Sequence, residues 1–457
     1  MEKFIQTLKN IWSIKELRDK ILFTLLILAV FRFGSYIVLP GVNASALEAA
    51  SSTSKASDLL QLINTFTGGA FNQGSIFALG IMPYITASII VQLLGFAVPY
   101  FQRLQQKEGE SGRKRLNQIT RFLTLLITLV QGSGYLLMLK TTPGAVDTSI
   151  NPTVFWFSNM IILATGTIFA MWLGERITDR GIGNGISLLI MVGIIARLPN
   201  AIAAEVLGKF ADNKLIFLIL EFILFFLIII ATILVVQGVR KIPIQAAKRM
   251  VGRTGGTNMA AGTGNDFINL KLSAAGVMPI IFAQAIMFLP LTAAQWATSN
   301  QGVQSDLLLS LNNPGSLAYN VIFFILIVIF TYVYTALIVN PQQYAEYLKR
   351  MNSFIPGIKP GQDTQDYIDT LTTRITLPGA IFIGIIAILP AMITKMGVNT
   401  AFAYFFGGTS LLILVGVVLD TLQQIESYLL MRKYDGLVKS GRIQGRGNQG
   451  ITIGAGM

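Results

Sequence analysis

Cysteine and histidine are both missing from this chain of 457 residues. Their absence excludes disulfide bonds, thiolate metal sites, HExxH metal centres and catalytic triads that need an imidazole. The Walker A pattern GxxxxGK[ST] is missing as well, so the chain has no recognisable means of hydrolysing a nucleotide. Any mechanical work in which the protein takes part must therefore be driven by a partner.

Charge is scarce too. Charged residues make up 12% of the chain and hydrophobic residues 53%, whereas an ordinary soluble domain carries about 25% charged residues. The apolar residues come in long blocks separated by short polar stretches. This pattern indicates one helical membrane domain rather than several soluble domains.

About 20 apolar residues in a helix cross the roughly 30 Å hydrocarbon core of a bilayer. Ten segments meet this requirement, and only three charged residues fall within them, namely Arg32, Arg197 and Glu221. We expect these three near span ends or inside the bundle, since charge at the bilayer centre is costly. The predicted spans are 21–39, 76–98, 122–139, 154–173, 186–202, 215–236, 274–294, 317–339, 375–393 and 401–419.

Lys and Arg are distributed unevenly between the two sets of loops that ten spans create. The set that includes both termini holds 28 of them, and the opposite set holds five. By the positive-inside rule both termini are predicted to be cytoplasmic, with the net charge of +13 concentrated on that face. The five opposite residues are Lys55, Lys140, Lys209, Lys214 and Lys395.

The N-terminus has two interpretations. Basic residues, an apolar run and the A-x-A of Ala44 to Ala46 imitate a signal peptide. However, Arg32 interrupts the run, and removing it would leave nine spans. We therefore favour an interfacial amphipathic helix over residues 1–20, with Phe4, Ile5, Leu8 and Trp12 on one face.

Residues 58–72 form an amphipathic segment too short to cross the membrane. They are predicted to be re-entrant or interfacial, with Gly68 and Gly69 ending a short helix and providing a hinge. From these residues alone, an ordinary surface helix is the simpler interpretation.

Eight motifs, in order along nearly the whole chain, resemble the SecY family. Such collinearity is specific, whereas any one glycine-rich stretch is weak evidence. The motifs are FRFGSYIVLPG (31–41), SIFALGIMPYITASIIVQLL (75–94), KEGESGRK (107–114), MWLGERITDRGIGNGIS (171–187), AGVMPIIFA (275–283), VNPQQYAEYLK (339–349), PGIKPG (356–361) and FFGGTSLLI (405–413).

The resemblance implies an all-α membrane protein with ten transmembrane helices in two inverted five-helix halves around an hourglass pore. The halves would be residues 21–202 and 215–419, followed by a cytoplasmic tail, 420–457. An odd number of spans per half does give the halves opposite orientations. The internal repeat itself is not visible in the residues.

The resemblance also assigns a narrow pore ring of isoleucines. Two pairs have i, i+4 spacing and so share one helix face, where an apolar ring can gate by dewetting. Without the resemblance, each isoleucine would be read as lipid-facing or core packing. The ring residues are Ile81, Ile85, Ile186, Ile190, Ile281 and Ile413.

The resemblance also implies that residues 58–72 are the plug of the resting pore. Phe66 would lie near the constriction, followed by Gly68, Gly69 and Asn72. A lateral gate is expected between the second and seventh spans, where polar side chains can bond across helices. Routine helix packing is the alternative for each gate residue. The expected gate residues are Thr86, Ile89, Gln92, Phe282, Gln284 and Ala285.

The resemblance implies that two long basic loops, 238–273 and 340–374, bind two partners. One is the ribosome, through its rRNA and ribosomal proteins, and the other is the ATPase SecA. A basic loop is more often just a topology determinant. Lys359 stands where the family motif usually has Arg, the stretch 252–264 is unusually rich in glycine, and the glycine-rich tail from Gly441 is predicted to be disordered. The docking residues would be Arg240, Lys248, Arg249, Arg253, Lys349, Arg350 and Lys359.

The predicted function is a non-enzymatic channel in the bacterial cytoplasmic membrane. It would pass unfolded secretory polypeptides and release transmembrane segments sideways into lipid. The implied partners are SecE, SecG, SecA, the ribosome, signal peptides and nascent chains, membrane lipids, and the accessory proteins SecDF and YidC. No cofactor or metal is expected. A secondary transporter is the chief alternative, although it would normally need more buried ionisable groups; an intramembrane enzyme is weaker, without His, Cys or a paired-Asp core.

Overall fold

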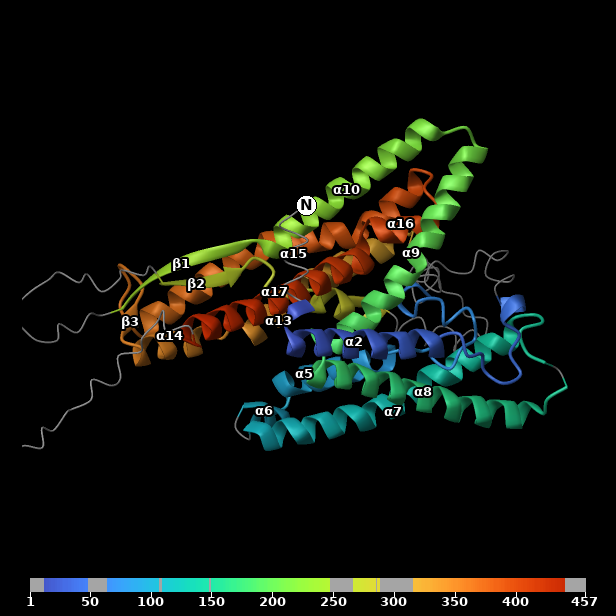
Figure 1. Ribbon diagram of the computed structural model, residues 1–457, viewed down its shortest axis with the longest axis horizontal. Helices are drawn as coiled ribbons and strands as arrows, with labels where there is room; N and C mark the ends of the chain where they lie inside the picture. The colour runs from blue at the N-terminus through green and yellow to red at the C-terminus, as the bar shows by residue number, and fades with distance from the viewer. Residues whose placement is uncertain are drawn as a thin grey trace, which may run out of the picture.

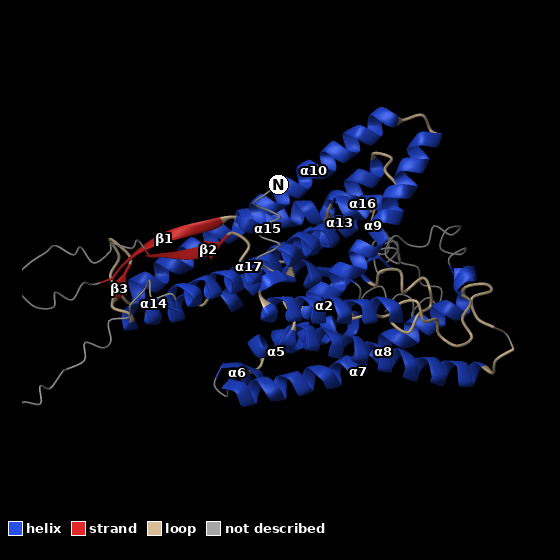
Figure 2. Ribbon diagram, in the orientation of Figure 1, coloured by secondary structure: helices blue, strands red, loops and turns tan. Residues whose placement is uncertain are grey.

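The structure is a computed structural model that describes residues 12–47, 64–106, 109–147, 149–246, 266–284, 286–287 and 315–439. Long helices run roughly side by side, and a small sheet lies at one end (Figures 1 and 2). The helices are α2 (Lys15–Gly34), α5 (Met82–Ala97), α6 (Pro99–Gln106), α7 (Gly109–Thr141), α8 (Pro152–Arg180), α9 (Gly185–Ala211), α10 (Leu215–Gln237), α13 (Leu317–Ile338), α14 (Pro341–Arg350), α15 (Gln362–Lys395), α16 (Thr400–Phe406) and α17 (Gly408–Lys439).

Seven helices in the described ranges are long and apolar enough to cross a membrane, and the bent pair α5 and α6 gives an eighth. The predicted helical membrane fold is confirmed, but the count of ten is not. The predicted span 274–294 is described only up to residue 287, with a gap at 285. The predicted interfacial residues Phe4, Ile5 and Leu8 and the tail from Gly441 lie outside the described residues.

Asparagine begins four of the helices. Asn151, Asn184, Asn340 and Asn399 precede α8, α9, α14 and α16, and each side chain accepts a hydrogen bond from a backbone N–H in the first turn. These bonds satisfy N–H groups that have no partner within the helix. Proline at the first position of α8 and α14 adds to the start signal, because its missing N–H costs nothing there.

Several predicted spans have different ends in the structure. The second span starts at Met82 rather than 76, because residues 76–81 form turns that end at Gly80 with φ +53°. The last span, predicted as one helix over 401–419, breaks between α16 and α17, where Gly408 has φ +66°. A side chain at Gly407 would place its Cβ 2.6 Å from the carbonyl oxygen of Ile386, so close packing keeps this break at glycine.

The two basic loops contain a three-stranded sheet that the sequence reading did not predict. β1 (Val239–Ala246) pairs antiparallel with β2 (Asp266–Lys271) and with the short β3 (Ser353–Phe354). Apolar residues at alternate positions, Ile242 and Ile244 on β1 and Ile268 and Leu270 on β2, pack on α14 and the first part of α15. This sheet and α14 form a folded unit outside the membrane bundle, here called the basic-face unit.

α15 begins at Gln362, although the sequence reading placed residues up to 374 in a loop. Its first turns carry Ile368, which is buried in the apolar core of the basic-face unit together with Leu348 of α14. One continuous helix therefore contributes both to this unit and to the bundle.

Candidate functional site: an apolar constriction and the segment that fills it

All six predicted ring isoleucines belong to the large apolar cluster at the core of the bundle, and three of them, Ile81, Ile85 and Ile190, line one small cavity. Ile81 and Ile85 are buried at the start of α5, Ile190 is buried on α9 and Ile413 on α17. Ile186 and Ile281 are half-buried and pack against the same cluster. Ile81 is the residue before α5 rather than a helical residue, so the shared-face argument holds in full only for Ile186 and Ile190.

Phe66, from the predicted plug, joins this cluster. Between Phe66 and the ring residues Ile81, Ile85 and Ile190 there remains a cavity of only about 10 Å³. That space holds one water at most, and its lining is almost entirely apolar. Phe66 is therefore tightly packed against these three isoleucines.

A wider space opens beyond Ile281, on the side of the sheet. This cavity, of about 260 Å³, is lined by the first turn of α9, the last turn of α10, α17 and the residues that follow β2. Ser187, Ser273 and Thr421 give its wall polar groups, and Lys271 and Asp420 give it one charge of each sign. This cavity is thus larger and more polar in its lining than the small apolar cavity beside Phe66.

The backbone of segment 64–74 lies directly on α9. The helical residues end at Phe66, and Gly68 and Gly69 follow with φ of +66° and +96°, as the predicted glycine stop requires. A Cβ added to Gly193 would lie 2.6 Å from the carbonyl oxygen of Phe66 and 3.2 Å from the amide nitrogen of Gly68. Only glycine at position 193 allows the two backbones to approach this closely.

Two of the three charges found in the predicted spans hold the same segment. Arg32 of α2 donates from Nη1 to the carbonyl oxygen of Gly68 at 2.6 Å and from Nη2 to the Tyr36 hydroxyl at 2.7 Å. The guanidinium of Arg197 lies beside Gly69, where an added Cβ would be 3.4 Å from its Nε. The sequence reading did not link these arginines to the plug, although a charge in an apolar span is itself a signal of function.

The end of the segment is bonded to its surroundings as well. The Tyr135 hydroxyl of α7 donates to the carbonyl oxygen of Phe71 at 2.8 Å, and both side chains are buried. The backbone N–H of Asn72 donates to the side-chain Oδ1 of Asn64 at 3.2 Å. Segment 64–74 therefore contacts α2, α7 and α9, all from the first half of the chain.

The predicted gate residues lie on two elements. Thr86 and Gln92 of α5 bond within their own helix, Thr86 to the carbonyl oxygen of Met82 and Gln92 to the Ser88 hydroxyl. Ile89 is buried in the apolar cluster that also contains Phe282. Ala285 lies outside the described residues.

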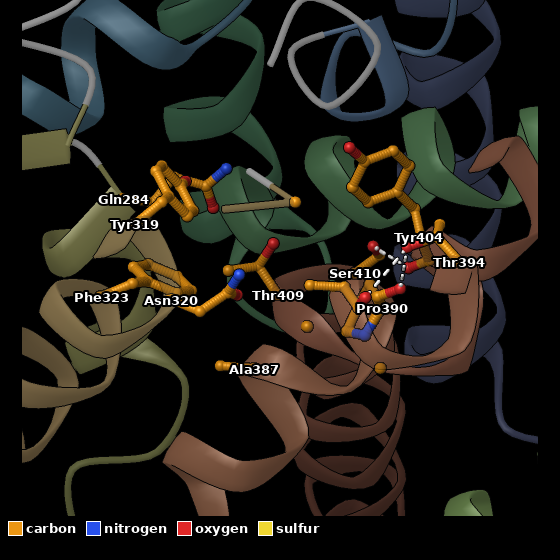
Figure 3. A pocket seen from close by; sticks show the side chains of 14 residues that line it. Gln284, Tyr319, Asn320, Phe323, Ala387, Pro390, Thr394, Tyr404, Thr409 and Ser410 are labelled. Carbon is orange, nitrogen blue, oxygen red and sulfur yellow. Dashed lines mark hydrogen bonds between the residues drawn. The ribbon is translucent and has the colours of Figure 1, made fainter. Parts of the chain in front are cut away.

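Phe282 and Gln284 face the second half of the chain. The Phe282 ring packs edge to face on Phe330 and Tyr334 of α13, with ring centroids 6.0 and 5.2 Å apart. Gln284 lines a cavity of about 50 Å³ together with residues of α13, α15 and α17, among them Asn320 and Thr409 (Figure 3). Within the described ranges, no hydrogen bond joins the predicted gate residues of α5 to Phe282 or Gln284.

The described docking residues are all exposed and lie on the basic-face unit or, for Lys359, in the turn between it and α15. Arg240 is on β1, Lys349 and Arg350 end α14, and Lys359 is in the turn before α15. Arg350 forms an exposed ion pair with Glu346 at 3.6 Å. Lys248, Arg249 and Arg253, with the glycine-rich stretch 252–264, lie outside the described residues.

Comparison with known proteins decides the family. A family model described as SecY matches residues 75–422. The protein translocase subunit SecY of Chlamydia trachomatis is 38% identical over 96% of this chain and 99% of its own length, and that of Escherichia coli is 39% identical over 94% and 96%. The chain belongs to the SecY family. This SecY-family chain is a multi-pass protein of the bacterial inner membrane.

Solved structures agree with this family. One described as a protein-conducting channel aligns with a TM-score of 0.63 at 18% identity, over 89% of this chain and 91% of that one. A SecY structure whose title concerns the plug domain aligns with a TM-score of 0.60 at 20% identity, over the same shares of both chains. The SecY-family chain is therefore a protein-translocation channel and not a transporter of small solutes.

The contact between α9 and segment 64–74 leads to a prediction. In Gly193→Ala, the added methyl group meets the backbone of Phe66 and Gly68, and overpacking of this kind costs about 1–3 kcal/mol. We expect amide hydrogen exchange in residues 64–74 to accelerate by roughly ten- to a hundredfold. Gly208→Ala on the same helix is the matched control, because an added Cβ there meets nothing within 4 Å. Equal exchange in the two variants would show that Gly193 does not hold the segment.

Proposed function

We propose that the isoleucine constriction is the path of an unfolded polypeptide and that segment 64–74 closes it in the resting channel. The packing of Phe66 against Ile81, Ile85 and Ile190 supports this proposal, because the cavity that remains among these four side chains, of about 10 Å³, is too small for a polypeptide. A polypeptide can pass only after Phe66 has moved away. The two positive-φ glycines, Gly68 and Gly69, give the backbone a place to bend.

The chemistry of the ring suits a channel with many substrates. Aliphatic side chains offer neither charge nor fixed hydrogen bonds, so they hold no particular sequence in the constriction. Arg32, for its part, bonds to the backbone of segment 64–74. Opening therefore requires that the hydrogen bond from Arg32 to Gly68 be replaced, for example by water.

We further propose that the channel parts sideways between α5 and the helical residues around Phe282 and Gln284. Hydrogen bonds within α5 satisfy Thr86 and Gln92, while Phe282 and Gln284 contact the second half of the chain. Parting the two elements would then break mainly apolar contacts. An apolar signal peptide or transmembrane segment can replace such contacts with its own, which keeps the cost of opening small.

The basic-face unit is the proposed docking surface. Arg240, Lys349, Arg350 and Lys359 present positive charge on a folded support, and a structure with a TM-score of 0.58 to this chain is Sec61 in a canine ribosome-channel complex. We propose the ribosome and the SecA ATPase as partners there, with SecE and SecG as further subunits and SecDF and YidC as accessory proteins. The chain itself acts without catalysis, and both termini are cytoplasmic.

A cross-link tests the sideways opening. The chain contains no cysteine, so Thr86→Cys with Phe282→Cys introduces the only thiols. We expect a short bismaleimide bridge between them to block export of a signal-bearing precursor by at least tenfold in reconstituted vesicles. The control pair is Phe282→Cys with Tyr334→Cys, which joins rings already in contact within the second half. Undiminished export with the first bridge in place would refute the gate, and an equal block by both pairs would indicate general damage.

Charge reversal tests the docking surface. In Lys359→Glu, each phosphate contact that is lost should make the slope of log affinity against log salt shallower by about 1. Ribosome binding to vesicles, measured by sedimentation at several salt concentrations, reports this slope. Lys395→Glu, exposed at the other end of α15, is the control. A slope that Lys359→Glu leaves unchanged would exclude Lys359 from the contact.

A further inference from the structure

A cluster of three buried charged side chains lies at the end of the bundle opposite the sheet, where α9 turns into α10 (Figure 1). Glu205 and Lys209 come from α9 and Glu221 from α10, and they are only 2%, 8% and 9% exposed. The Lys209 Nζ lies 2.8 Å from Oε1 of Glu221 and 3.5 Å from Oε1 of Glu205. Two carboxyl groups thus share one ammonium group, which leaves one negative charge in excess.

The cluster also binds the segment between α15 and α16. The Lys209 ammonium group donates to the carbonyl oxygen of Gly397 at 3.1 Å, and the backbone N–H of Asn399 donates to Oε2 of Glu205 at 2.9 Å. Among the described residues, two buried carboxyl oxygens then have no hydrogen-bond donor: Oε2 of Glu221, and Oε1 of Glu205, which has only the ion pair with Lys209 at 3.5 Å.

An excess charge and two unsatisfied oxygens are both costly in a buried site. A single proton lowers both costs, since it neutralises the excess charge and turns one of the carboxyl oxygens into a donor. We propose that Glu205 and Glu221 together bind one proton at neutral pH, next to the Lys209 ammonium group. The proton-bound cluster ties α9 and α10 to residues 397–399.

A metal cation fits the cluster less well. Sodium and larger hard cations take several oxygen ligands, and the ammonium group of Lys209 already occupies the position between the carboxyl groups. The carbonyl oxygen of Gly397 is bonded to Lys209. In the described part of the site, only the two carboxyl oxygens without a hydrogen-bond donor remain as ligands. Two oxygens are too few for a hard metal cation, whereas a proton needs only one or two.

The other charged groups nearby are exposed. Asp212 and Lys214, in the turn between α9 and α10, pair with each other at 3.2 Å, with side chains 61% and 54% exposed. Lys395 is exposed at the end of α15, and α16 contains no charged residue. Among the described residues at this joint, the three-residue cluster is therefore the buried charged group, and gain or loss of a proton would change its stability the most.

The position of the cluster gives the proton a consequence for the channel. The turn between α9 and α10 connects the two proposed halves, 21–202 and 215–419, so this step rests on the proposed function. Loss of the proton leaves the excess negative charge buried and weakens the attachment of α9 and α10 to residues 397–399. We expect alkaline conditions to loosen this joint, which would ease movement of one half against the other.

Infrared difference spectroscopy of the full chain in detergent tests the proton site directly. A protonated carboxyl group has a carbonyl band that a carboxylate lacks. Exposed carboxyl groups lose their proton near pH 4, so a band that persists to about pH 7 belongs to a buried group. We expect this band in the unmodified chain, its loss in Glu221→Gln and in Glu205→Gln, and its retention in the exposed control Asp212→Asn.

Unfolding measurements provide the second readout. The folded chain would hold a proton that the unfolded chain has released, so stability must fall as pH rises through the point where the cluster loses it. Glu221→Gln needs no such proton, and its stability should change less between about pH 7 and pH 10. If one glutamine variant does not fold, the other serves.

Two results would overturn the proton site: no band at neutral pH in the unmodified chain, or a stability that depends on sodium concentration and not on pH. The band could persist to about pH 7 and disappear in alkaline solution, as expected, while pH has no effect on channel opening. That result would support the proton site and contradict only its role at the joint. Neither readout depends on the closure of the constriction by segment 64–74, so the two proposals can fail separately.

Discussion

The proposed closure of the channel depends on the direct contact between two backbones, that of segment 64–74 and that of α9 at Gly193. This contact brings Phe66 among the ring isoleucines and leaves a cavity of only about 10 Å³. It needs glycine on both sides, since Gly68 lies against Gly193 and has a positive φ. Arg32 then satisfies the carbonyl oxygen of Gly68, which would otherwise face an apolar surrounding.

Charged side chains inside this bundle lie at two places. Arg32 and Arg197, both half-buried, lie beside segment 64–74, whereas the buried Glu205, Lys209 and Glu221 lie where the two proposed halves join. A charge inside an apolar bundle is tolerated only with partners, and in both places the partners come from different segments of the chain. The charges therefore stabilise particular arrangements of elements, and a rearrangement must break those bonds.

Much of the bundle could be predicted from the sequence, because long apolar runs have few structural alternatives in a membrane. The helices α10 and α13 begin and end within a residue of the predicted spans 215–236 and 317–339. The basic loops were harder. Their apolar residues alternate over too few positions to distinguish a strand from a turn, and β1 pairs with β2 and β3 only through distant contacts. The late start of α5 and the break at Gly407 and Gly408 also depend on tertiary packing.

Site prediction had a similar limit. The family motifs placed the isoleucines and Phe66, and the structure has all of them in the large apolar cluster at the core of the bundle. Lys209 was assigned to a loop because the fifth span seemed to end at 202, but α9 continues to Ala211 and buries it beside Glu221. Its pairing across two helices could not be read from spacing along the chain. The contacts of Arg32 and Arg197 with the plug likewise involve residues distant in sequence.

Ion conductance measures the central claim most directly, namely that segment 64–74 seals an otherwise passable constriction. Deletion of residues 60–70 removes Phe66, Gly68 and Gly69 and leaves the ring isoleucines in place. In planar bilayers without substrate, the account predicts frequent and lasting channel openings for the deletion variant and a closed unmodified chain. If the deletion variant conducts no more than the unmodified chain, the segment is not the seal and the account is contradicted.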